Sequence, residues 1–352
     1  MQNKKTQRNG IIEFLRFIAS LSILVYHFEL IYLERSIHFM HLYIWVEFFF
    51  IISGFFLAKN INNKESAIEY TWKQIKKLYP IYLLGFIATF IVTNIFFHTT
   101  LKGLLISLWK TKFEIFLINI FSLDPYTNLI NLGGGSSYIG ALLIGTLFVY
   151  YMIQNHKKVF QNLAPIFILC GYCLLLNTFG NLSQWAHLIT IPSGIIRAIC
   201  GLSVGAFLYL TLNDKFKKLG NTKNSMIVIV SLFVAVGLIV FKNSINSFDL
   251  VFYVVIFGMM IASSYNIKIP YVSNTFVGIG LLNKICIYLG NLSYPIFIFH
   301  YVVIFYFKNF LSPMSYKIEL IAVSFCTIIL AMLILFIQNK IIPMMKSKKK
   351  TV

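Results

Sequence analysis

The sequence predicts an all-α polytopic membrane protein with about ten transmembrane helices and both termini in the cytoplasm. The composition is 58% hydrophobic and only 12% charged, whereas soluble domains carry about one quarter charged residues. About ten apolar segments reach the roughly 17 to 25 residues that a bilayer crossing needs. Lysine and arginine gather in alternate connections between these segments, which is the pattern that sets membrane topology.

The apolar segments are distributed along the whole chain. The first lacks a small-residue cleavage site and is long enough to span, so we interpret it as a retained helix and not as a signal peptide. An even number of crossings places both termini on one side, and we expect a single membrane domain over residues 1–352. The predicted spans are residues 11–33, 41–58, 78–97, 136–153, 160–179, 192–212, 225–241, 248–265, 285–307 and 317–338.

The net charge of +19 falls in short connections, which argues against nucleic acid as a partner. With the termini in the cytoplasm, 21 of the 30 Lys and Arg residues lie inside and seven lie outside. The remaining two, Arg16 and Arg197, fall within predicted helices. The outer seven are Arg35, Lys102, Lys110, Lys112, Lys242, Lys308 and Lys317.

Two segments do not fit a spanning pattern. Residues 98–135 form an outer loop whose amphipathic run, 101–121, is typical of an interfacial or re-entrant element. Residues 339–352 form a basic tail, predicted to be cytoplasmic. The five cysteines all fall in apolar segments, so neither a disulfide framework nor a metal site is expected.

The first predicted helix carries an arginine and a histidine within an apolar segment. Arg16 and His27 are eleven residues apart, which puts them on one helix face, about 16 Å apart along the axis. An arginine at membrane depth costs at least a few kcal/mol, so such residues usually pair, line a cavity or serve function. Glu13 lies one turn before Arg16 and can pair with it.

Glu47 and Arg197 add ionisable groups to two further predicted helices. Together with Arg16 and His27 they indicate an internal polar cavity, because facing lipid would cost several kcal/mol in total. Imidazole can take a proton from a hydroxyl near neutral pH, and arginine suits an anion or a developing oxyanion. Glu47 is expected to orient His27 or to pair with an arginine.

Structural alternatives exist for each of these groups. Glu13 and Arg16 can be an ion pair at the membrane edge, and His27 can be an interfacial histidine bonded to a backbone carbonyl. Lys73, Lys76 and Lys77 either set topology alone or also attract an anionic cytosolic ligand.

Several motifs resemble the acyltransferase-3 family of membrane acyltransferases. Glu13-Phe-Leu-Arg16 with His27 is similar to the first-helix motif of that family. The second-helix motif, an acidic residue with phenylalanines and Ser-Gly-Phe, resembles residues 46–57, although Glu47 stands where aspartate is more common. Further matching segments are Lys76-Lys77-Leu-Tyr79-Pro80-Ile-Tyr82, in which lysines replace the usual arginines, Arg197 to Tyr209, and Leu289 to His300.

The resemblance implies transfer of an acyl group, most often acetyl, from a cytosolic acyl-CoA to a hydroxyl of a cell-envelope glycan or glycolipid. It implies a multi-pass protein of the cytoplasmic membrane, with membrane lipid and a glycan acceptor as partners. Neither a metal nor an oligomeric state is predicted. The expected roles are catalytic for His27 and Arg16, supporting for Glu13, Glu47, Ser53 and Arg197, donor-binding for Lys73, Lys76, Lys77 and Tyr79, and acceptor-binding or structural for Ser293, Tyr294 and His300.

Two other classes of protein share some of these features. An exporter of polysaccharide or lipid-linked sugar would also use ten helices, a basic inner face and intramembrane charges, although no internal repeat of the transporter kind is seen. A glycan polymerase would need a large basic outer loop, and residues 98–135 supply only Lys102, Lys110 and Lys112.

Overall fold

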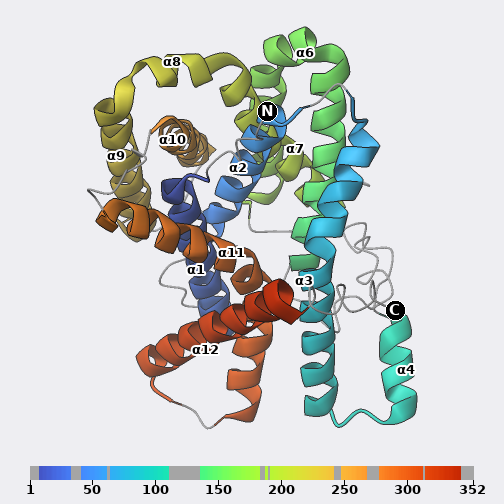
Figure 1. Cartoon of the computed structure of the whole chain (residues 1–352). Coiled ribbons are helices and arrows are strands. Elements are labelled where there is room, and N and C mark those ends of the chain that lie inside the picture. Colours follow the sequence, from blue (N-terminus) through green and yellow to red (C-terminus); the bar gives the residue numbers. More distant parts are fainter. Residues whose placement is uncertain are drawn as a thin grey trace, which may run out of the picture.

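The computed structural model describes residues 8–32, 41–61, 64–110, 135–182, 187–188, 191–241, 247–267, 277–311 and 314–341. In this part of the chain, long helices make up the fold (Figure 1). The elements in chain order are α1 Gly10–Tyr32, η1 Leu42–Ile44, α2 Trp45–Lys59, α3 Ala67–Phe96, α4 Leu101–Lys110, α6 Gly135–Phe179, β1 His187–Leu188, β2 Ile191–Pro192, α7 Ser193–Phe207, η4 Leu208–Leu212, α8 Asn213–Lys218, α9 Gly220–Phe241, α10 Ser247–Asn266, α11 Val277–Phe310, α12 Tyr316–Phe336 and η5 Ile337–Ile341.

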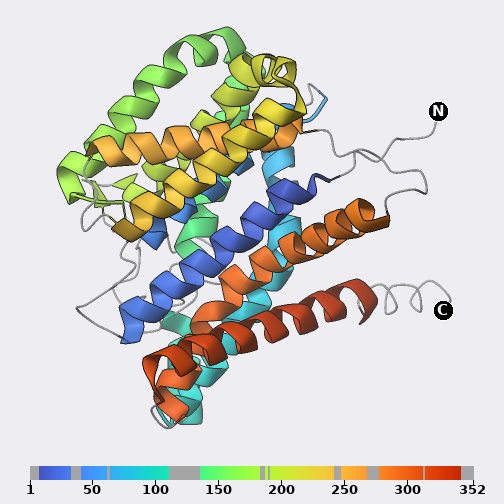
Figure 2. The same ribbon diagram turned by 90° about the vertical axis from the view of Figure 1, so that its left-hand side faces the viewer.

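The predicted helical, multi-pass architecture is confirmed. Within the described ranges, nine helices are long and apolar enough to cross a membrane. One of them, α6, contains two of the ten predicted spans, separated at His156, where the backbone leaves the helical region with φ of −135° and ψ of 43°. Figure 2 shows the start of α1 and the end of α12 on the same side of the bundle. That this side is cytoplasmic stays a prediction from the charge distribution.

Helix α3 begins eleven residues before the predicted span, and a capping box explains the difference. The Ser66 hydroxyl accepts from the Glu69 backbone N–H at 3.2 Å, and the Glu69 carboxylate accepts from the Ser66 N–H at 2.8 Å. These contacts satisfy two backbone donors at the helix start. The first turns of α3 are polar, and a prediction from hydropathy does not detect polar helical turns. The predicted start of the helix was therefore too late in the sequence.

The outer loop predicted for residues 98–135 is described only in its first part. There α4 forms the beginning of the predicted amphipathic run, with Leu101 77% exposed and Trp109 72% exposed. Residues 111–134 and 342–352, which hold the rest of that run and most of the predicted basic tail, lie outside the described ranges.

Two apolar cores hold the bundle together, and α1 contributes to both. Ile12, Leu15 and Ile23 pack into the larger core with side chains of α2, α6, α7 and α10. Leu24 and Phe28 pack into the smaller core with side chains of α11 and α12. Figure 2 shows α1, in dark blue, between the green and yellow helices on one side and the deep orange and red helices on the other. Side chains on α1 are therefore anchored from both sides.

Helices α2 and α7 cross at very short range through two glycines. A Cβ atom at Gly205 would overlap the backbone carbonyl of Ile51, and one at Gly54 would overlap the backbone carbonyl of Leu202. Membrane helices use such small residues to bring backbones together, because lipid supplies little hydrophobic drive for helix association. This crossing fixes Glu47 on α2 beside Arg197 on α7.

We predict that Gly205→Ala destabilises the protein, because a rigid backbone carbonyl cannot move aside for the new methyl group. Overpacking of this kind costs about 1–3 kcal/mol or more. Gly237→Ala in α9 is the matched control, since, apart from its chain neighbours and the nearby backbone of its own helix, no atom lies within 4 Å of a Cβ placed there. Thermal unfolding in detergent should show a lower Tm for Gly205→Ala alone, and equal Tm values for the two variants would contradict the prediction.

Candidate active site

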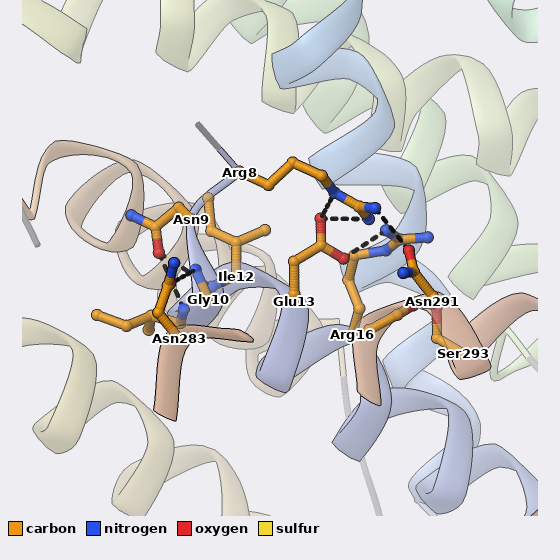
Figure 3. A network of polar contacts seen from close by, with 11 residues as sticks. Arg8, Asn9, Gly10, Ile12, Glu13, Arg16, Asn283, Asn291 and Ser293 are labelled. Carbon is orange, nitrogen blue, oxygen red and sulfur yellow. Dashed lines mark hydrogen bonds and ion pairs between the residues drawn. The ribbon is translucent and has the colours of Figure 1, made fainter. Parts of the chain in front are cut away.

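Asparagines fix the beginning of α1 against two neighbouring helices. The Asn9 side chain accepts from the Ile11 backbone N–H at 2.9 Å, as an N-cap does. Its amide nitrogen donates to the Ser264 carbonyl of α10 at 2.7 Å. The Gly10 N–H donates to the Asn283 side chain of α11 at 2.9 Å. These contacts, drawn in part in Figure 3, hold the first turn of α1 in place just before Glu13 and Arg16.

Glu13 is the centre of a small ionic cluster at this end of α1. Its carboxylate pairs with Arg16 at 2.9 Å and with Arg8 at 2.6 Å. The side chain of Glu13 is only 9% exposed, whereas those of Arg16 and Arg8 are 28% and 45% exposed. Arg8 also donates to the Asn291 side chain at 2.5 Å, and a Cβ atom at Gly290 would overlap Glu13, so α11 closes against the cluster. Figure 3 shows both guanidinium groups turned toward the one carboxylate.

Lys77 of α3 gives this cluster an excess of positive charge. It interacts electrostatically with Arg16, Arg8 and Glu13. Two cations therefore pair with one carboxylate, a third acts on it electrostatically, and Lys77 is itself exposed. Guanidinium and ammonium groups with incomplete charge pairing and access to solvent are suited to bind an anionic ligand. We call Arg8, Arg16, Lys77 and Glu13 the cationic cluster.

Lys73, Lys76 and Tyr79, which were also expected to bind the donor, contact other residues. Lys73 pairs with Glu65 at 2.8 Å, and the ammonium group of Lys76 lies 5.6 Å from the ring centroid of Trp72. Tyr79 packs its ring near Tyr82, with 6.1 Å between centroids. Of the three predicted lysines, the structure therefore brings Lys77 to the cationic cluster, while Lys73 and Lys76 lie in contacts along α3 itself and its preceding loop.

His27, farther along α1, faces His300 of α11. The Nδ1 atom of His27 lies 2.8 Å from the Nε2 atom of His300. On its other side, His300 Nδ1 lies 3.1 Å from the Ile296 carbonyl oxygen, one turn earlier on α11. His300 is 1% exposed, while His27 keeps part of its surface accessible. Helix geometry puts this histidine pair about 16 Å along α1 from Arg16.

Glu47 and Arg197 form a separate, fully buried network. The guanidinium of Arg197 pairs with the Glu47 carboxylate, and the Tyr172 hydroxyl donates to the same carboxylate at 2.5 Å. Arg197 also donates to the backbone carbonyls of Leu182 at 2.6 Å and Tyr43 at 3.4 Å. Of the two arrangements expected for Glu47, the structure shows pairing with an arginine. With Arg197 3% and Glu47 0% exposed, this network connects α2, α6 and α7.

The remaining predicted polar residues make local or interhelical contacts. Ser293 is buried and donates to the Gly290 carbonyl of its own helix at 2.7 Å. The Tyr294 hydroxyl donates to the Leu78 carbonyl of α3 at 2.9 Å. Ser53 lies partly exposed on α2.

Tyr138 of α6 interacts with residues of more than one of these groups and was not expected from the sequence. It interacts electrostatically with Arg16, Glu47 and Arg197. Its ring centroid is 4.9 Å from that of Phe297, which in turn is 6.1 Å from that of His300. Aromatic contacts thus connect Tyr138 to the histidine pair through Phe297.

Sequence reasoning also missed Arg8, Asn291 and Tyr172. Arg8 is one of the 21 basic residues predicted to lie inside, and its position five residues before Glu13 allows contact across the helix start. Asn291 lies within the Leu289 to His300 segment, so a search for polar residues beside the matched serine could have found it. No pattern in the sequence identifies Tyr172, because its partner lies 125 positions away.

Comparisons with known proteins agree with this architecture. A family model described as an acyltransferase domain matches residues 9–337. A protein of Acidianus two-tailed virus, named "Putative acetyltransferase ORF330", is 23% identical over 296 residues, which are 81% of this chain and 80% of the viral protein. No solved structure matches the chain significantly. Because the family model covers nearly all of the sequence, the chain belongs to the acyltransferase-3 family of integral membrane acyltransferases.

Proposed function

We propose that this protein transfers an acyl group, acetyl in the simplest case, from a cytosolic coenzyme A thioester to a hydroxyl of a cell-envelope glycan or glycolipid. The observation that carries the proposal is the arrangement along α1. The cationic cluster stands at one end of that helix, and the histidine pair stands about 16 Å farther along it. The cationic cluster could bind an anionic donor, and the histidine pair could accept a proton from a hydroxyl acceptor.

The cationic cluster suits the phosphate groups of the donor. Arg16 and Arg8 each share the Glu13 carboxylate, and Lys77 adds a further positive charge. Arginine can bind phosphate oxygens through two parallel hydrogen bonds, and lysine acts as a point charge. The pantetheine arm that joins these phosphates to the thioester is an extended chain. Phosphates held at the cluster would therefore leave the thioester farther along α1.

His27 suits proton transfer from the acceptor. In the proposed reaction the hydroxyl oxygen bonds to the thioester carbonyl carbon, the C–S bond breaks, and the hydroxyl proton passes through His27 to the leaving sulfur. General-base catalysis of this kind contributes about 10²–10⁴-fold in rate. Tyr138 and Phe297, which are 7% exposed each, form aromatic contacts that end at His300.

The predicted topology gives this arrangement a direction. With the start of α1 in the cytoplasm, Arg16 lies near the inner face and His27 lies nearer the outer face of the cytoplasmic membrane. Cytosolic acyl-CoA would approach Arg16, and an envelope glycan would approach His27.

We predict that His27→Ala abolishes glycan acylation, with a loss of at least about 10²-fold, because the proton acceptor is removed. Membranes would be incubated with labelled acetyl-CoA and isolated glycan, and label transfer would be measured at equal protein levels. His156→Ala, at the kink of α6, is the control histidine variant and should keep full activity. Normal transfer by His27→Ala would rule out its assigned role.

We also predict that Lys77→Ala raises KM for acyl-CoA about threefold to tenfold, because one exposed positive charge that attracts the donor phosphates is removed. Lys76→Ala is the matched control, since it is the preceding lysine of α3 and lies over Trp72. The increase should shrink at high salt, because the interaction is electrostatic. Equal KM values for the two variants would remove Lys77 from the donor site.

The exporter alternative is distinguished by mass analysis of the envelope polysaccharide with and without this chain. Loss of one acyl group per repeat unit supports the transferase. An unchanged repeat mass together with glycan accumulating inside the cell supports export.

A further inference from the structure

The histidine pair has a definite pattern of hydrogen-bond donors and acceptors. The Ile296 carbonyl oxygen can only accept, so the Nδ1 atom of His300, 3.1 Å away, carries the proton of that hydrogen bond. A neutral imidazole has one N–H, and the Nε2 atom of His300 is then an acceptor. That acceptor faces the Nδ1 atom of His27 at 2.8 Å.

The same reasoning extends to His27. Since His300 Nε2 accepts, His27 Nδ1 must donate, and in the neutral ring this leaves His27 Nε2 with a free lone pair. The two ring planes are within 18° of each other, and the centroids are 4.9 Å apart. This geometry suits a hydrogen bond in the plane of both rings. A single backbone carbonyl on α11 therefore determines which nitrogen of His27 can act as a base.

Burial separates the roles of the two histidines. His300 is 1% exposed, and its ring centroid lies 6.1 Å from that of Phe297. His27 keeps accessible surface and is flanked by the rings of Tyr26 at 5.3 Å and Tyr301 at 6.4 Å. Only His27 is therefore available to a substrate, and His300 acts through it.

We infer that His300 is a positioning residue, which holds His27 in the tautomer with the proton on Nδ1 and directs its Nε2 lone pair to the acceptor hydroxyl. This inference rests on the proposed function. During transfer, Nε2 takes the hydroxyl proton as the C–O bond forms and the C–S bond breaks, and then gives that proton to the leaving sulfur. The Nδ1–H of His27 stays bonded to His300 throughout, which stabilises the transient imidazolium.

Three substitutions of His300 separate this role from packing. The amide of glutamine reaches about as far as Nε2 of histidine and can accept from His27, whereas the shorter amide of asparagine reaches only about as far as Nδ1. We predict that His300→Ala and His300→Asn lower kcat about 10²- to 10³-fold, while His300→Gln stays within about tenfold of the native protein. KM for acyl-CoA should be unchanged in all three, because His300 is remote from the cationic cluster.

A spectroscopic measurement tests the inference without relying on activity. In ¹⁵N-histidine NMR of the full chain in lipid, His27 should show a protonated Nδ1 and an unprotonated Nε2, its signals being identified by their loss in His27→Gln. In His300→Ala this preference should disappear. Because the chain has seven histidines, the difference spectrum is needed for the assignment.

The outcomes distinguish failure of the inference from failure of the proposed function. An unprotonated Nδ1 on His27 in the native protein, or full kcat in His300→Ala, would overturn the positioning role. Equal losses in His300→Gln and His300→Asn, at normal Tm, would also overturn it and indicate packing alone. Retained acylation by His27→Ala would instead remove the proposed base, while the native spectrum could still report the tautomer. If the His300 variants do not fold, the native spectrum decides the question.

Discussion

The penalty for an unpaired polar or charged group at membrane depth is the constraint on which this structure depends. It explains why Glu13, Glu29, Glu47, Arg197 and Glu319, which are buried within the spans, each contact a polar partner. Besides the groups of the candidate site, two carboxylate–tyrosine contacts join α1 to α12. The Tyr316 hydroxyl donates to Glu29 at 2.5 Å, and the Tyr32 hydroxyl donates to Glu319 at 2.7 Å. These polar contacts thus add to the apolar cores in holding α1 against α12.

Helix α1 carries most of this pairing and also belongs to both apolar cores. Its first turn is capped from α11 and anchored to α10, and its later turns are held by α11 and α12. A helix with contacts on so many sides cannot rotate or slide freely, because either movement would break these hydrogen bonds. The cationic cluster and the histidine pair are therefore kept at a constant separation. The proposed function depends on such a separation, because a coenzyme A thioester carries its phosphates at one end and the reactive carbonyl at the other.

The two arginines within the spans have different surroundings, and the difference bears on their chemistry. Arg16 shares one carboxylate with Arg8, lies near Lys77 and keeps 28% of its side chain exposed. Arg197 is 3% exposed and is bonded to a carboxylate and to two backbone carbonyls. The first retains positive potential for a ligand, while the second is neutralised and ties α7 to α2. Arg16 is therefore suited to bind a ligand, whereas Arg197 has a structural role.

The sequence alone was sufficient to predict the helical class, the approximate spans, and the presence of Arg16 and His27 on one helix face. It could do so because hydropathy and the period of 3.6 residues are local properties. It also anticipated the Glu13–Arg16 contact, which spans one turn. Only the tertiary structure decided that His27 meets His300, that Glu47 meets Arg197, and that Lys77 alone among three lysines reaches the cluster. These contacts join residues that are between 61 and 273 positions apart, and their formation depends on how helices pack and rotate, which no local pattern encodes.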